Sequence, residues 1–445
     1  MPAARYKRLV DAFAAEIRSG RLTSGTQLPT HRRLAEREGI AVVTASRVYT
    51  ELEAMGLVSS EHGRGTFVRD QTLPPGHGID QRPLAAESVD LNFNYPALPG
   101  QVDLLRQALR ELAGSGDLES LLRYQPHGGR ERDRAAVANH LLDRGLDTTS
   151  DSIVVVNGAQ HGLTVVALAA LRPGDLVAAD AITYPGFKVI AEALRLELAP
   201  IPTTPTGPDL DALGRLCVER PVRAVYTMPT LHNPLGWVMD DGARRQLVAI
   251  ARRHRLLLIE DASYAYLAEC PPPPLAATAP DVTVYVSGLS KNVATGLRVG
   301  FVAAPTVRIP ALERAIRATA WNTPALTTAI ATRWIEDGTV ARLEAEKRAD
   351  ARLRQTVAGK ALKPFHPQAH PNSYFTWVPL PESARADRIA ATLATYGVAI
   401  STAEPFAITE NPPQAIRLAL GSTELGTLAD ALTTVRRAIE DDQYQ

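Results

Sequence analysis

The stretch Ser287–Gly300, Ser-Gly-Leu-Ser-Lys-Asn-Val-Ala-Thr-Gly-Leu-Arg-Val-Gly, decides the fold of the longer part of this 445-residue chain. It places one lysine and one arginine between two apolar runs, 282–286 and 299–303. Earlier apolar runs of strand length lie at residues 153–156, 176–179, 224–227 and 256–259, with helical segments such as 241–254 between them. Continuous apolar runs that alternate with helices are typical of a largely parallel sheet, so we predict an α/β domain.

Polar side chains follow most of these runs. In parallel α/β sheets, ligands bind at the carboxyl ends of the strands. The polar segments are residues 157–160, 184–186, 232–236, 261–264 and 287–291. We therefore expect one rim of the sheet to gather an amine, a carboxylate, a phenol, amides and a glycine turn that precedes a helix.

Lys291 is the amine of that rim, and the chain has only six lysines among its 48 basic residues. A lysine at a strand end, with Arg298 in the same loop, suits an aldehyde cofactor that carries a phosphate. The amine forms a Schiff base and the guanidinium holds the phosphate bidentately. A carboxylate against a pyridine nitrogen would keep that nitrogen protonated, and backbone N–H groups at a helix start would bind the phosphate.

Three motifs resemble those of fold-type I pyridoxal-phosphate enzymes, the aspartate-aminotransferase superfamily. Ser290-Lys291 followed by Gly296-Leu297-Arg298-Val299-Gly300 is similar to the lysine motif. Residues 259–264 resemble the pyridine-binding segment, and Asn233-Pro234-Leu235-Gly236 resembles the Asn-Pro-x-Gly turn. The resemblance implies a mostly parallel sheet with a small C-terminal α+β domain, and pyridoxal 5'-phosphate (PLP) as the cofactor.

The resemblance also implies roles for the residues around the cofactor ring. Lys291 would hold the cofactor as the internal aldimine, and Asp261 would pair with the pyridine nitrogen. Tyr264 and Asn233 would hydrogen-bond the 3-oxygen of the ring. Tyr184 would stack on the ring.

Further roles concern the phosphate and the ligand. The phosphate would be held by Gly158, Ala159, Gln160, Ser290 and Arg298. Tyr124 would reach the phosphate of the neighbouring subunit, and Arg417 would bind a ligand carboxylate. No metal site is expected, because the two cysteines, Cys217 and Cys270, are widely spaced.

One position departs from the family pattern. The residue three places before the lysine is usually Ser or Thr and here is Gly288, so Ser287 is the candidate substitute. His127 and His232 lie close to the motifs, and we interpret them as ordinary polar loop residues.

The first seventy residues have a different pattern. Residues 5–19 are predicted to form an amphipathic helix, a second helix begins after Thr30 as N-cap, and a third covers about 42–55. Residues 57–68 then indicate a hairpin around a polar turn. Two short helices, a turn and a longer helix followed by a hairpin form a winged helix-turn-helix.

Segments 28–35, 46–49 and 63–68 closely resemble the winged-helix domain of GntR-type bacterial transcription factors. The resemblance implies contacts to double-stranded DNA from Arg32, Arg33, Thr44, Ser46, Arg47 and Arg64. The family usually has Ser, Arg and Thr at the start of the recognition helix, where this chain has Ala41, Val42 and Val43. Valine methyl groups are expected to contact thymine methyl groups instead.

Composition limits the classes of function. Lys+Arg and Asp+Glu are both 48, which argues against a globally basic nucleic-acid binder. Residues 1–70 carry eleven basic and eight acidic side chains, 11 − 8 = +3, so the remainder carries −3. We find no apolar run of membrane-spanning length and no signal-peptide pattern, and therefore expect a cytoplasmic protein without a membrane partner.

A GntR-like winged helix joined to an aminotransferase-like domain resembles the MocR subfamily of regulators. We predict a DNA-binding domain at 1–69, a linker at 70–88 and a PLP-binding domain at 89–445. The resemblance implies a homodimer, commonly with crossed winged helices, that senses an amino-bearing effector or the vitamer. The alternatives are an active aminotransferase that carries a DNA-binding module, and a cofactor-free scaffold.

Overall fold

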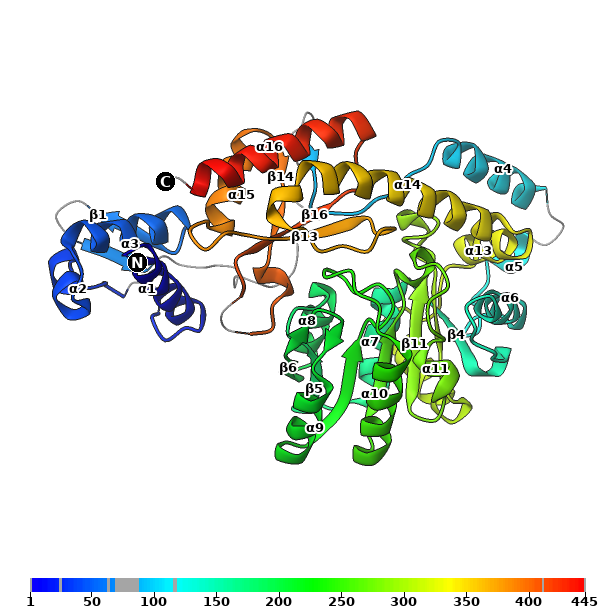
Figure 1. Cartoon of the computed structure of the whole chain (residues 1–445). Coiled ribbons are helices and arrows are strands. Elements are labelled where there is room, and N and C mark those ends of the chain that lie inside the picture. Colours follow the sequence, from blue (N-terminus) through cyan, green and yellow to red (C-terminus); the bar gives the residue numbers. More distant parts are fainter. Residues whose placement is uncertain are drawn as a thin grey trace.

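The computed structural model describes residues 2–23, 26–61, 65–68, 88–114, 118–409 and 412–443. The N-terminal part forms the predicted helices and hairpin at one end of the molecule (Figure 1). Its elements are α1 (Pro2–Arg18), α2 (His31–Glu38), α3 (Val42–Ala54), β1 (Val58–Glu61) and β2 (Gly65–Val68). The strands β1 and β2 pair antiparallel, as a wing requires.

The core of this part follows from the spacing of its apolar residues. Ala45, Val48 and Leu52 of α3 are fully buried at intervals of three and four residues, against α1 and α2. Thr30 caps α2 as predicted, because its Oγ1 accepts a hydrogen bond from the backbone N–H of Arg33 at 3.3 Å. Ala41 precedes α3 and provides no side-chain cap.

The second part contains the expected α/β sheet, which has seven strands in the order β4-β12-β11-β10-β9-β5-β6. Its pairs are parallel except where β12 lies between β11 and β4. The strands are β4 (Ile153–Val156), β5 (Leu176–Asp180), β6 (Glu197–Ile201), β9 (Val222–Thr227), β10 (Leu257–Asp261), β11 (Thr283–Gly288) and β12 (Gly300–Ala303). The six predicted strands are confirmed, and β6 is an edge strand that the apolar runs did not indicate.

Helices pack around this sheet and bury its apolar side chains, so the strands β4, β5, β10, β11 and β12 are buried along their whole length. The helices are α6 (Glu131–Leu142), α7 (Ala159–Ala170), α8 (Pro185–Ala193), α9 (Leu210–Glu219), α10 (Asp241–His254), α11 (Leu275–Thr278), α12 (Ile309–Thr319) and α13 (Ala325–Glu336). Ahead of them lie α4 (Gln101–Ala113) and α5 (Leu118–Leu121).

The C-terminal part is the expected small α+β unit. The long helix α14 (Thr339–Ala361) leads into an antiparallel sheet of β13 (Phe375–Pro379), β16 (Ala415–Ala419) and β15 (Ser401–Thr402). Helices α15 (Ala386–Thr395) and α16 (Leu425–Gln443) pack on each other above it and lie beside the winged helix (Figure 1). Two short strands, β3 (Val89–Asp90) and β14 (Val398–Ala399), pair in parallel. Among the described helices, none has the length and apolar character needed to cross a bilayer.

Candidate functional site

A cavity of about 670 Å³ lies where the carboxyl ends of the sheet strands meet the C-terminal part. Most of the residues that the motifs indicated line it together, although they come from segments far apart in the sequence. These lining residues are Ala159, Gln160, Tyr184, Asn233, Asp261, Tyr264, Ser290, Lys291, Arg298 and Arg417. The predicted rim of the sheet therefore exists as a cavity.

Lys291 lies in the turn that follows β11 and is half-buried. Its Nζ donates a hydrogen bond to the backbone carbonyl of Asn94 at 3.1 Å. Its own carbonyl accepts hydrogen bonds from Tyr266 Oη at 2.9 Å and from Lys347 Nζ at 3.2 Å. The backbone carbonyl of Lys291 is thus held by two hydrogen bonds, while its amine has one neutral acceptor among the described residues and can turn toward a ligand.

Asp261 ends β10 with a fully buried carboxylate. One oxygen, Oδ2, accepts a hydrogen bond from Tyr226 Oη at 2.9 Å. The other, Oδ1, accepts from Ser263 Oγ at 2.6 Å and from its backbone N–H at 3.0 Å. Burial raises the pKa of the Asp261 carboxyl, and the hydrogen bonds from Ser263 and Tyr226 partly offset this rise. A cation placed against this carboxylate would keep it ionised.

Arg298 lies across the glycine turn that starts α7. Its Nη1 donates to Ser290 Oγ at 3.3 Å and its Nη2 to the carbonyl of Asn157 at 3.2 Å. Gly158 has φ +83°, and a Cβ at this residue would lie 2.9 Å from Nη2 of Arg298. The turn therefore requires glycine, and it brings a guanidinium next to the first N–H groups of a helix, which is a favourable place for an anion.

Gly288 explains the departure from the family pattern. It pairs with Gly300 across β11 and β12, and a Cβ at Gly288 would lie 3.0 Å from the carbonyl oxygen of Val299. A side chain there would be tightly restricted. Ser287 does not replace the missing hydroxyl, because its Oγ donates to the carbonyl of Ala262 and it does not line the cavity.

Three polar side chains surround the centre of the cavity. Tyr184 precedes α8, and its hydroxyl donates to Gln160 Oε1 at 3.0 Å. Burial and the nearby Asp261 raise the pKa of this phenol, so it stays protonated. Asn233 is buried and its Oδ1 has no hydrogen-bond partner among the described residues, while the ring of Tyr264 packs edge-on against Phe375.

Arg417 lies on β16 with an exposed fraction of 3%. Its Nη1 donates to the carbonyl of Asn92 at 2.6 Å, and its Nε is buried without a hydrogen-bond partner. The guanidinium carbon is 5.4 Å and 5.9 Å from the ring centres of Phe375 and Phe406. Burial lowers the pKa of Arg417, and it pairs with no carboxylate among the residues the structure describes. A buried cation of this kind is a good binding site for a ligand carboxylate.

Two predicted site residues, Gly158 and Tyr124, do not line the cavity, and one interpretation was wrong. Tyr124 does not line the cavity and is 84% exposed beside Trp321. His232 is not an ordinary loop residue. It is fully buried, stacks on Trp237 with ring centres 4.3 Å apart, and places Nε2 3.6 Å from Asp180 Oδ2. His127 contacts the carbonyl of Trp321.

The motifs missed Lys347 of α14. Its Nζ donates to the carbonyls of Lys291 at 3.2 Å and Val293 at 2.7 Å, and its side chain is fully buried. Burial, followed by the charge of Lys291, lowers the pKa of Lys347 to about 7. Only its rarity as one of six lysines could have indicated it from the sequence.

The candidate DNA-contacting residues form a second group. Arg32 and Arg33 are exposed at the start of α2. On α3, Ser46 Oγ lies 2.9 Å from His31 Nδ1, and the guanidinium of Arg47 lies 4.3 Å from the ring centre of Tyr6. Thr44 is half-buried on the same helix. Arg64 lies outside the described residues.

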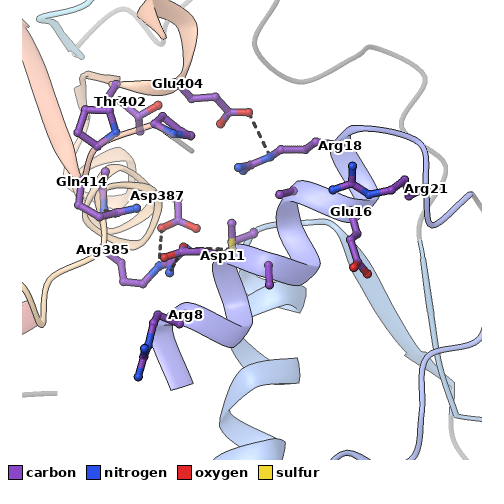
Figure 2. Close-up of a pocket in the computed structure, with 17 residues that line it drawn as sticks. Arg8, Asp11, Glu16, Arg18, Arg21, Arg385, Asp387, Thr402, Glu404 and Gln414 are labelled. Atoms are coloured by element: carbon purple, nitrogen blue, oxygen red, sulfur yellow. Dashed lines mark hydrogen bonds and ion pairs between the residues drawn. The ribbon is translucent and has the colours of Figure 1, made fainter. Parts of the chain in front are cut away.

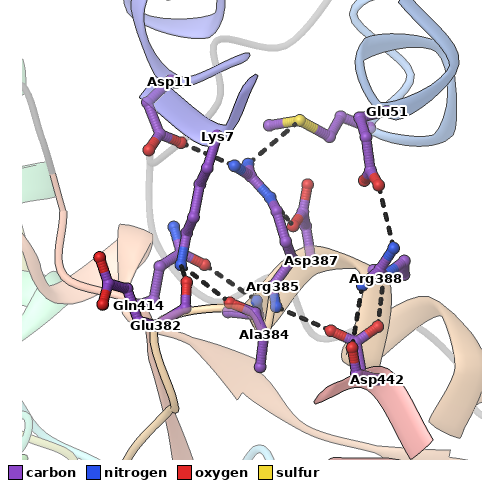
Figure 3. Close-up of polar contacts among 12 residues, drawn as sticks. Lys7, Asp11, Glu51, Glu382, Ala384, Arg385, Asp387, Arg388, Gln414 and Asp442 are labelled. Carbon is purple, nitrogen blue, oxygen red and sulfur yellow. Dashed lines mark hydrogen bonds and ion pairs between the residues drawn. The ribbon is translucent and has the colours of Figure 1, made fainter. Parts of the chain in front are cut away.

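The winged helix rests on the C-terminal part through polar contacts (Figure 3). Arg385 is almost fully buried, and its Nη1 donates to Asp11 Oδ1 of α1 at 2.8 Å. Arg388 of α15 donates to Glu51 Oε1 of α3 at 3.0 Å and also contacts Asp442 of α16. Lys7 Nζ donates to the carbonyls of Glu382 and Ala384. The recognition helix is thereby tied to the C-terminal part by its last turns.

A second contact zone surrounds a cavity of about 480 Å³ between α1 and the segment around β15 (Figure 2). Here Arg18 Nε lies 3.2 Å from Glu404 Oε1. Glu404 opens the short helical turn Glu404–Phe406, whose Phe406 lines the larger cavity near Arg417. One short segment therefore contacts the winged helix on one side and the candidate site on the other.

Comparison with known proteins agrees with both parts of the chain. Residues 86–433 match the family described as aminotransferase class I and II, and residues 5–68 match bacterial regulatory proteins of the gntR family. The chain belongs to the aminotransferase class I and II family. Members of this fold family depend on PLP, and here the family domain follows a GntR helix-turn-helix domain.

Several relatives are named as regulators. An uncharacterized HTH-type transcriptional regulator, YdeF of Bacillus subtilis, is 27% identical over 98% of this chain and 94% of its own length. The probable rhizopine catabolism regulatory protein MocR of Rhizobium meliloti is 25% identical over 70% of this chain and 67% of its own. Thus the MocR-like architecture is confirmed.

Solved structures establish the fold of the second part. A multiple substrate aminotransferase from Thermococcus profundus has a TM-score of 0.74 at 24% identity, over 81% of this chain and 93% of its own. The α-aminoadipate aminotransferase LysN of Thermus thermophilus has a TM-score of 0.73 at 22% identity, over 81% and 94%. The second part of the chain therefore has the fold-type I aminotransferase fold.

Proposed function

We propose that this protein is a DNA-binding transcription regulator that holds PLP at Lys291 and responds to an amino compound or to the vitamer itself. The observation that carries the proposal is a GntR helix-turn-helix in one chain with a cavity where Lys291, Asp261 and Arg298 meet. The domains would be 1–69 and 89–445, joined by the linker 70–88. A DNA partner would place the protein in the cytoplasm.

The residues of the cavity fit PLP. The Oδ1 of Asn233 is buried without a partner and would gain one from a group on the ring, and burying an unpaired acceptor is otherwise costly. The guanidinium of Arg298 lies beside the Gly158 turn, without an ion-pair partner among the described residues, and suits a phosphate dianion. The remaining phosphate ligands would be Ala159, Gln160 and Ser290.

When bound, PLP supplies an aldehyde that takes up primary amines and a ring that withdraws electrons. Lys291 would provide the protein's own amine for that aldehyde. Asp261 would hold a proton on the pyridine nitrogen, and the resulting cation would counter the rise that burial causes in the pKa of this carboxyl. Tyr264 and Asn233 would hydrogen-bond the ring oxygen, and Tyr184 would pack on its face.

Arg417 would bind the carboxylate of an amino-bearing effector and so begin the response. Ser401 pairs with Arg417 across β15 and β16, and Glu404 follows three residues later. Lys188 holds this segment by donating to the carbonyls of Glu404, Pro405 and Ala407. A ligand that moves Arg417 would thus move Glu404, which contacts Arg18. The ligand can shift the equilibrium between the two arrangements only by the difference between its binding free energies for them.

A homodimer is part of the proposal. Exposed apolar side chains gather on and after α4 and α5, where a second copy would cover them. They are Val102, Leu105, Leu109, Leu118, Leu122 and Tyr124. Tyr124 would then extend toward the phosphate bound by the partner.

The test is a mobility shift with full-length protein on the DNA upstream of its own gene, with and without PLP. We expect sequence-specific binding whose affinity changes with PLP or with an added amino acid. Absence of specific binding in every ligand state would contradict the proposal.

An active aminotransferase is the second candidate, favoured by the complete set of Lys291, Asp261 and Arg417 in one cavity. Single-turnover spectroscopy across amino acids separates the two. Rapid conversion of the cofactor to its pyridoxamine form, with release of 2-oxo acid, would favour the enzyme. A protein without cofactor absorbance, unchanged by Lys291→Ala, would support a cofactor-free scaffold.

A further inference from the structure

Two valines are exposed at the leading end of the recognition helix α3. Val42 has an exposed fraction of 46% and Val43 one of 81%. The helical repeat places Val43 on the face opposite the buried residues Ala45, Val48 and Leu52, and Val42 at the edge of that face. Covering their methyl groups with another apolar group would be favourable, because it removes apolar surface from water.

The polar side chains of this face are engaged within the domain. Ser46 lies within hydrogen-bond distance of His31, and Thr50 Oγ1 donates to the carbonyl of Ser46 at 3.1 Å. The guanidinium of Arg47 lies over the ring of Tyr6. The methyl groups of Val42 and Val43 are therefore the prominent surface at the start of α3.

The contacts to the C-terminal part leave this surface open. They involve α1 and the far end of α3, where Glu51 meets Arg388 and Met55 meets Arg385 (Figure 3). Arg32 and Arg33 are exposed on the adjoining helix and form no ion pair among the described residues. The two exposed valines and the two unpaired arginines together suit a polyanion that also carries apolar groups.

In the major groove of DNA, the 5-methyl group of thymine is the one apolar group that the four standard bases present. We propose that Val43, with Val42 beside it, reads thymine methyl groups of the operator, while Arg32 and Arg33 hold the phosphates on either side. This inference rests on the proposed DNA-binding function and adds the base that the recognition helix selects.

The test uses full-length protein loaded with PLP. Binding sites are first selected from a pool of random duplexes, and each thymine of the selected site is then replaced by deoxyuridine, which lacks only the 5-methyl group. We expect wild-type affinity to fall about fourfold for a replacement opposite Val43, the equivalent of burying one methylene-sized group. Val43→Ala should prefer the thymine duplex over the uracil duplex less strongly than wild type does.

The matched control is Val218→Ala, because Val218 is 79% exposed on α9 in the other part of the chain. This variant should keep the wild-type preference for thymine. Equal wild-type affinity for both duplexes, or an unchanged preference in Val43→Ala, would overturn the inference while leaving DNA binding intact. If no specific site can be selected, the inference and the proposed function both fail.

Discussion

Lys291 is the residue on which the proposed function depends most directly, because no other lysine lines the cavity among the described residues. We expect Lys291→Ala to abolish covalent attachment of PLP, measured as the added mass after borohydride reduction, and to remove the visible absorbance. Lys360→Ala changes an exposed lysine of α14 and should keep both signals. Retention of covalent PLP in the Lys291 variant would show that a different amine is used.

Tyr226 is predicted to set the acid limit of PLP binding through Asp261. Burial raises the pKa of Asp261 and the hydrogen bond from Tyr226 lowers it, so Tyr226→Phe raises it further. Binding needs the ionised carboxylate and is therefore lost as pH falls through this pKa, at a higher pH in the variant.

At neutral pH we expect Tyr226→Phe to bind PLP about tenfold more weakly, since a hydrogen bond to a charged group contributes about 1.5 kcal/mol. Absorbance titrations with PLP between about pH 5 and 8 measure both effects. Tyr396→Phe, at an exposed tyrosine, should behave like wild type. If Tyr226→Phe and Tyr396→Phe lose PLP binding at the same pH, Tyr226 does not set the acid limit.

Residues next to strand ends could be predicted from the sequence, but the buried residues that contact them could not. Lys291, Asp261 and Asn233 each follow an apolar run within a recognisable motif, so their convergence was foreseeable. Tyr226 is a buried aromatic inside a strand, and only the packing of β9 beside β10 brings its hydroxyl to Asp261. His232 was misread for the same reason, because loop sequence does not reveal that Trp237 covers it.

At the scale of elements, β12 must lie close to the turn before α7. A Cβ at Gly300 would lie 2.6 Å from the backbone carbonyl carbon of Gly158, whereas a Cβ at Gly296 would meet nothing within 4 Å. We expect Gly300→Ala to destabilise the protein by about 1–3 kcal/mol, and Gly296→Ala to have a much smaller effect. Urea unfolding of both variants without cofactor measures the difference. Equal losses would mean that the strand and the turn can separate freely.

The sequence predicted elements well where the whole element is buried or strongly periodic. The central strands are continuous apolar runs, and α10 has a stripe on one face, so both patterns were clear. Strand β6 contains Glu197 and Pro200 and alternates between exposed and buried positions, as an edge strand does, so no apolar run revealed it. The short strands of the C-terminal sheet are defined by pairing between distant segments rather than by local pattern.

At the scale of the whole molecule, the exposed apolar surface after α4 predicts dimerisation. Leu122 is 87% exposed, and Leu122→Asp would place a charge where the second copy is proposed to pack. We expect the variant to sediment as a monomer and to bind PLP more weakly, because Tyr124 no longer reaches the partner's phosphate. Val307→Asp, at a valine of similar exposure, should remain a dimer. If Leu122→Asp is still a dimer, the dimer interface lies elsewhere.

The two parts of the chain are expected to communicate through the Arg18–Glu404 ion pair. The Arg18–Glu404 pair joins α1 to the segment that carries Phe406 and pairs with the strand of Arg417. Glu404→Gln should leave PLP titrations unchanged, because Glu404 does not line the larger cavity. It should reduce the ratio of DNA affinities with and without PLP by up to about fivefold, since a partly exposed ion pair contributes at most about 1 kcal/mol.

Arg436→Gln breaks an exposed pair with Glu440 on α16 and serves as the control. Its ratio of DNA affinities should equal that of wild type. If Glu404→Gln also keeps the wild-type ratio, the signal must pass instead through Arg385 and Arg388, whose partners Asp11 and Glu51 can be replaced in the same assay. Because neither Arg18 nor Glu404 lines the larger cavity, a changed ratio with unchanged PLP binding would indicate coupling between the two parts.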